Sequence, residues 1–137
     1  MKYSAFILLV FAMTGCQLSQ DKRHWKAMST YLGTYQVNIR KSNFGSYKDT
    51  NVYRNVTLTL KTDTTFEFSE DLPFLTQTKG KFRMTGDDIG EWCHLIYDDG
   101  SEDQCLRDVN KAIYIKYPRG RKWKKGADLL YLNKIRD

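Results

Sequence analysis

The sequence predicts an all-β fold, an antiparallel eight-stranded up-and-down barrel. Apolar and polar residues alternate over short runs, which places the apolar residues on one face of each strand. Mostly short connections with turn residues join these runs, so sequential strands are expected to be antiparallel neighbours. Strand-forming aromatics are abundant, with 9 Tyr and 7 Phe but only 2 Pro. Closing the sheet hides its edges, and an open two-sheet sandwich is the alternative.

The first fifteen residues are typical of a secretory signal peptide. Lys2 precedes a short apolar run at residues 5–13, and the small residues Thr14 and Gly15 follow it. The run is too short to cross a bilayer as a helix, which takes about 20 residues. Residues 16–31 are predicted to be a polar tether. Trp25, Met28 and Leu32 lie three and four residues apart, so the end of the tether is either one helical turn or an irregular linker.

Cys16 follows Thr14 and Gly15 directly, and residues 13–16 resemble a bacterial lipobox. That resemblance implies cleavage before Cys16 and attachment of lipid, such as palmitate, to the new N-terminal residue. The alternative is cleavage by the ordinary signal peptidase, which would leave Cys16 free or later paired.

Residues 32–137 are predicted to form the barrel domain. The clearest strand is 52–61, where Val56, Leu58 and Leu60 alternate with polar residues. The other expected strands are 32–40, 65–69, 78–85, 91–97, 101–109, 111–117 and 128–135.

An ordered set of short motifs carries a family resemblance: Gly33-Thr34-Tyr35, the hairpin 58–66, Gly80-Lys81-Phe82, the turn 86–89 and the closing run 129–132. This order resembles the small lipocalin-like lipoproteins of bacterial envelopes, including the copper-homeostasis type, and implies a short eight-stranded barrel. Tyr35 stands where lipocalins usually have Trp. The early Cys-x-x-Cys of the copper-homeostasis type is missing, so its metal binding is not carried over.

Cys93 and Cys105 are predicted to face each other in one hairpin. A three-residue loop at 98–100, with Gly100 in the left-handed region, would pair Tyr97 with Ser101. Counting back along both strands then places Cys93 opposite Cys105, within disulfide reach. We expect a disulfide because exported proteins meet an oxidising compartment. A free buried pair and a thiol metal site are the alternatives, and the second lacks ligands beyond His94.

Two function hypotheses follow, both for an envelope lipoprotein held to the membrane by its N-terminal lipid. In the first, the barrel binds a small apolar or amphipathic ligand. Its expected inner wall consists of Val56, Leu58, Leu60, Phe66, Phe68, Phe82, Met84, Ile113 and Ile115. In the second, the barrel is filled and acts as a protein-interaction or inhibitor module. A cavity of about 300 Å³ or more would favour the first hypothesis.

No enzyme activity, cofactor or metal is predicted, because no catalytic motif occurs in the chain. An enzymatic function would need His94 and a carboxylate to converge in an open cleft. The chain is expected to be a monomer. Gln17 follows the anchor cysteine where enteric inner-membrane lipoproteins have Asp, which favours the outer membrane.

The loop 118–126 is strongly basic and contains a Trp. We expect it either to contact an anionic surface or to be a solvated hairpin loop. The residues proposed for that contact are Arg119, Arg121, Lys122, Trp123, Lys124 and Lys125. The charge of this loop also suits nucleic acid, but export argues against that partner. Thr64, in Asp63-Thr64-Thr65, resembles an O-glycosylation acceptor of some Bacteroidota.

Overall fold

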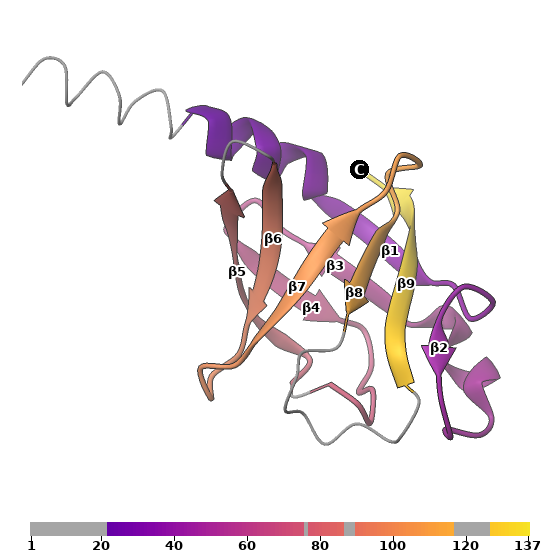
Figure 1. The fold of residues 1–137 in the computed structure, drawn as a ribbon. Coiled ribbons are helices and arrows are strands. Elements are labelled where there is room, and N and C mark those ends of the chain that lie inside the picture. The colour runs from indigo at the N-terminus through magenta and orange to yellow at the C-terminus, as the bar shows by residue number, and fades with distance from the viewer. Residues whose placement is uncertain (1–21, 76, 87–89, 117–126) are drawn as a thin grey trace, which may run out of the picture.

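The computed structural model describes residues 22–75, 77–86, 90–116 and 127–137. Eight antiparallel strands close into an up-and-down barrel, as the sequence predicts (Figure 1). They are β1 (Gly33–Val37), β3 (Thr57–Leu60), β4 (Thr65–Phe68), β5 (Lys79–Gly86), β6 (Glu91–Ile96), β7 (Glu102–Arg107), β8 (Ile113–Lys116) and β9 (Ala127–Arg136). Each pairs with the next, and β1 pairs with both β3 and β9, which closes the barrel. A short strand, β2 (Asn43–Phe44), pairs with the start of β9.

One predicted strand begins later than expected. Residues 52–55 belong to a 3-10 helix, η1 (Thr50–Asn55), and only β3 itself is extended and paired. Asp49 precedes η1 with a φ of 55°, in the left-handed region. That backbone turns the chain into η1, so residues 52–55 do not join the sheet.

A helix over residues 22–31 lies across one end of the barrel (Figure 1). Met28 and Tyr31 on this helix are buried. The hydroxyl of Tyr35 donates to the carbonyl of Tyr31 at 2.6 Å, which fixes the helix to the start of β1. Burial raises the pKa of Tyr31 to about 12. Within the described residues, no helix is long and apolar enough to cross a membrane.

The opposite end is covered by an aromatic cluster. Phe74 lies 5.7 Å from Phe44, 5.7 Å from Tyr47 and 5.8 Å from Tyr53, measured between ring centroids. These residues come from the segments that join β1 to β3 and β4 to β5. One end of the barrel is therefore covered by the helix that precedes β1, and the other by connections between strands.

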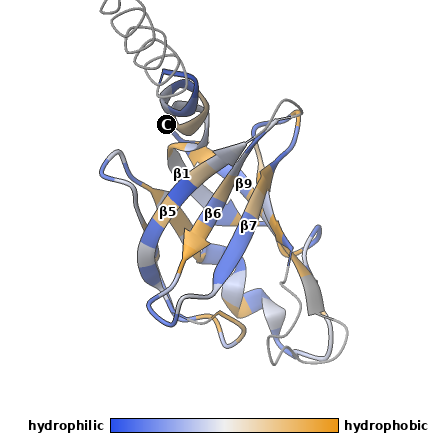
Figure 2. Cartoon of the chain, turned by 60° about the vertical axis from the view of Figure 1, so that its left-hand side comes forward, coloured by the Kyte–Doolittle hydropathy of each residue, from blue (hydrophilic) through white to orange (hydrophobic). Residues whose placement is uncertain are grey.

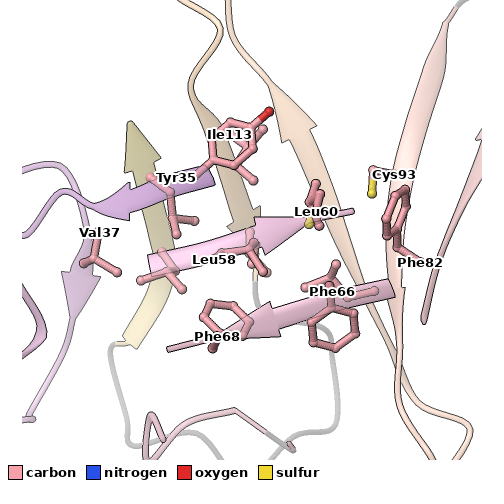
Figure 3. Close-up of a cluster of buried hydrophobic side chains, with 14 of the residues drawn as sticks. Tyr35, Val37, Leu58, Leu60, Phe66, Phe68, Phe82, Cys93 and Ile113 are labelled. Carbon is pink, nitrogen blue, oxygen red and sulfur yellow. The ribbon is translucent and has the colours of Figure 1, made fainter. Parts of the chain in front are cut away.

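The interior between these ends is filled with side chains (Figure 3). Leu58, Ile113 and Ile115 are completely buried, and Phe66 and Phe68 are nearly so. One carboxylate, Asp103, also lies inside, and the hydroxyl of Tyr97 donates to it at 2.5 Å. Figure 2 shows the alternation of hydrophobic and hydrophilic residues along the barrel wall. The core thus occupies the space in which a lipocalin would hold its ligand.

Candidate functional site

A groove lies at the helix end of the barrel, where β4 is too short to accompany β5. The registered pairs between β4 and β5 end at Thr65 and Lys81, although β5 continues to Gly86. The amide of Phe82 still donates to the carbonyl of Thr64, at 2.8 Å. Beyond that bond the helix, and not a strand, lies beside β5. The resulting groove has a volume of about 400 Å³.

The groove combines an apolar floor with an exposed aromatic wall. Its lining residues are His24, Trp25, Met28, Thr64, Phe82, Arg83 and Met84. Met28 and Phe82 are 7% and 3% exposed, so they form the floor. Trp25 is 59% exposed, which is unusual for so large an apolar side chain. The arrangement suits a ligand with an apolar body that packs on Trp25 and the two methionines.

Arg83 and His24, at the rim of the groove, each lie beside a carboxylate. The Nη2 atom of Arg83 lies 2.9 Å and 3.0 Å from the two carboxylate oxygens of Glu102. The Nε2 atom of His24 lies 3.8 Å from Glu91. The rim is therefore polar, and Arg83 and His24 each have an acidic neighbour.

A hydroxyl, an imidazole and a carboxylate meet on the outer face of β5, β6 and β7. The Nε2 atom of His94 lies 2.8 Å from the Thr85 hydroxyl. Its Nδ1 atom lies 3.1 Å from the Glu102 carboxylate. The contacts run from hydroxyl to imidazole to carboxylate, as they do in a catalytic triad of nucleophile, base and orienting acid. However, Thr85 and His94 do not line the groove, and Arg83 already compensates the charge of Glu102. We therefore assign this network to the wall of the barrel.

The predicted ligand-lining residues divide into two groups. Phe82 and Met84 line the groove. The others, which do not line it, are buried in the core or at its edge: Val56, Leu58, Leu60, Phe66, Phe68, Ile113 and Ile115. An eight-stranded barrel is just wide enough for its own side chains to fill it, and the strands here are short. The sequence prediction missed the helix residues His24, Trp25 and Met28, although the spacing of Trp25 and Met28 was the signal for a helical face.

The two cysteines lie opposite each other, as predicted. Cys93 pairs with Cys105 and His94 with Gln104, and Gly100 has a φ of 79° in the left-handed region. Both cysteines are free thiols in the structure and fully buried, so the expected disulfide is not present in it. A hydrogen bond with Cys93, together with burial, raises the pKa of the Cys105 thiol.

Several predicted residues lie outside the described part of the chain. They are Cys16, Arg119, Arg121, Lys122, Trp123, Lys124 and Lys125. Thr64 is described, and it is exposed at the tip of the hairpin between β3 and β4. No group of His, Cys, Asp and Glu side chains within the described ranges is suited to hold a metal ion.

The fold and the groove together define a small closed antiparallel β-barrel with a helix across one end. Comparison with family models, with curated proteins and with solved structures finds no match to this chain.

Proposed function

We propose that this protein is a lipid-anchored lipoprotein of the bacterial cell envelope, similar to small lipocalin-like barrels, that binds one small amphipathic molecule. The proposal places the ligand in the groove at the end of the barrel and not inside it. The lipobox-like residues 13–16 support the anchor. The observation that carries the binding function is the groove of about 400 Å³ with an apolar floor and the exposed Trp25.

The residues at the groove favour a ligand with an apolar body and a small polar head. Burying the ligand against Met28, Phe82 and Met84 would stabilise the complex in proportion to the apolar area removed from water. Thr64 and the donors of His24 and Arg83 are available to the head group at the rim. Because Arg83 and His24 already have acidic neighbours, a strongly charged head group would have to compete with Glu91 and Glu102.

Native mass spectrometry of protein extracted from its own membrane tests this proposal. We expect a retained small-molecule adduct on the wild-type chain, and its loss in Trp25→Ala and in Met84→Glu. Val52→Ala is the matched control, because Val52 is 65% exposed and belongs to η1, away from the groove. Retention of the same adduct by all three variants would rule out the groove as the binding site.

The second candidate is a protein-interaction or inhibitor module, and the filled interior favours it. The completely buried Leu58, Ile113 and Ile115 leave the barrel to act as a rigid support for its outer surface. This function predicts that the extracted wild-type chain carries no small-molecule adduct. An adduct that depends on Trp25 would exclude it as the primary function.

We also propose that Cys93 and Cys105 form a disulfide in the oxidising envelope. Antiparallel partners have Cα atoms about 4.5–5.5 Å apart, within disulfide range. Each thiol would give up a proton and one electron, and a donor disulfide would take both electrons and become two thiols. Since both cysteines are fully buried, the reaction has to precede closure of the barrel during folding.

A further inference from the structure

We propose that the helix end of the barrel docks directly on an anionic membrane surface, with Trp25, Val109 and Ile135 at the interface. The proposal goes beyond the anchor, since it fixes how the barrel faces the membrane. It rests on the proposed lipidation of Cys16 for proximity to the bilayer. This docking face consists of Lys22, Arg23, Trp25, Lys26, Val109, Lys111, Ile135 and Arg136.

Exposed apolar side chains are concentrated at this end. Four large hydrophobic residues are strongly exposed among the described residues: Trp25 at 59%, Val52 at 65%, Val109 at 96% and Ile135 at 54%. Trp25 belongs to the helix, Val109 to the turn between β7 and β8, and Ile135 to the end of β9. The up-and-down topology brings these three segments to the same end of the barrel (Figure 1). Only Val52 lies elsewhere.

Positive charge surrounds these apolar residues. Lys22, Arg23 and Lys26 are exposed on the helix, and none has an acidic partner within the described residues. Lys111 and Arg136 are exposed on the two other segments. Asp137 is on the same side but is bonded to Lys134 at 2.7 Å. Figure 2 shows the start of the described helix as hydrophilic. Basic side chains around exposed apolar ones are the composition of surfaces that bind anionic lipid.

The anchor would hold this end close to the bilayer. Only residues 17–21 separate Cys16 from Lys22, where the described helix begins. A chain advances by at most about 3.6 Å per residue, so Lys22 lies within roughly 20 Å of the lipidated residue. At physiological ionic strength charges interact over about 8 Å, so a small movement brings the docking face into range.

The two strand ends that flank the predicted basic residues 119–125 lie away from the helix. They are Lys116, at the end of β8, and Ala127, at the start of β9, and both lie at the end of the barrel opposite the helix (Figure 1). One flat membrane cannot contact both ends of the barrel. The five residues between Cys16 and the helix favour membrane contact at the helix end.

The experiment measures which end of the lipidated protein a membrane covers. A spin label at Asn110→Cys reports on the docking face, and one at Lys48→Cys reports on the far end. Both positions are exposed, while the native Cys93 and Cys105 are fully buried and will not react in the folded protein. Accessibility to a soluble nickel chelate is compared on vesicles of phosphatidylcholine and on vesicles that also contain phosphatidylglycerol.

We expect phosphatidylglycerol to protect the label at position 110 and to leave the label at position 48 accessible. Each basic residue near an anionic membrane contributes about 1 kcal/mol to binding, and about 1.4 kcal/mol changes an equilibrium tenfold. Lys22→Gln with Lys26→Gln should therefore lower the ratio of docked to undocked protein about 30-fold. Lys48→Gln with Lys81→Gln is the control of equal charge and should change little.

Equal accessibility of both labels on anionic vesicles would overturn the proposal, and so would protection of position 48 alone. Sedimentation with phosphatidylcholine vesicles tests the anchor separately, because the attached lipid inserts into a membrane without anionic head groups. A chain that sediments only with the anionic vesicles would overturn the anchor while supporting the docking face.

Discussion

Oxidation of Cys93 and Cys105 should raise the stability of the barrel by an amount that can be calculated. The bond would join directly opposed residues of β6 and β7 and close a loop of about a dozen residues. Loop entropy for that length gives roughly 3 kcal/mol. An unfolding entropy of about 2.1 cal/mol/K per residue, over a domain of this size, converts this into a rise in Tm of about 12 °C.

Thermal unfolding with and without a reductant measures this difference. Cys93→Ala with Cys105→Ala is the control, and its Tm should not respond to the reductant. Alkylation must follow denaturation, because both thiols are fully buried in the folded chain and would escape reagent in either redox state. Alkylation of both cysteines in unreduced, denatured protein from the envelope would refute the bond. If the reductant shifted the Tm of the double variant as much as that of the wild type, the contribution calculated for the disulfide would be refuted.

Three further predictions concern stability. Leu58→Ala removes a completely buried side chain and should cost about 2–5 kcal/mol in the free energy of urea unfolding. Gly80→Ala should cost about 1–3 kcal/mol in the same assay, since a Cβ there would lie 2.5 Å from the carbonyl oxygen of Ile96 and 2.6 Å from the Phe66 ring. Lys61 and Lys79 lower the pKa of Glu67 from 4.5 to about 2. Because this pKa is depressed, the wild-type chain should be more stable than Glu67→Gln above about pH 4.5 and should lose that extra stability as the pH falls toward 2. Tm values of both proteins measured across that range test this. A pH-independent difference between the two proteins would contradict the role of Lys61 and Lys79.

The parts of the fold that sequence predicted well are those set by neighbours in the chain. Loop length and the left-handed Gly100 determine the register of the hairpin that pairs Cys93 with Cys105. The alternation at Leu58 and Leu60 determines which face of β3 is buried. Closure of β1 on β9 agrees with the argument from sheet edges, because an open sheet would leave them exposed.

The groove could not be predicted, because it arises from elements that are distant in sequence. It forms because β5 extends beyond the first residue of β4, and because the helix fills only part of the space beside that extension of β5. The helix takes its position from Tyr31, whose carbonyl accepts from Tyr35 and whose hydroxyl donates to the carbonyl of Glu91 at 3.4 Å. No short sequence pattern predicts these contacts. The strand expected at residues 52–61 begins only at Thr57, because residues 50–55 form η1.

The unequal lengths of β4 and β5 have a consequence for how the barrel opens. Three registered residue pairs join β4 to β5, whereas six join β5 to β6. β4 has only three such pairs with β3 as well, so local opening costs least at the two edges of β4. Phe82 lies beside the edge that β4 shares with β5 and separates the groove from the core. Local opening of the filled barrel is therefore expected beside β4, at a place that adjoins the groove.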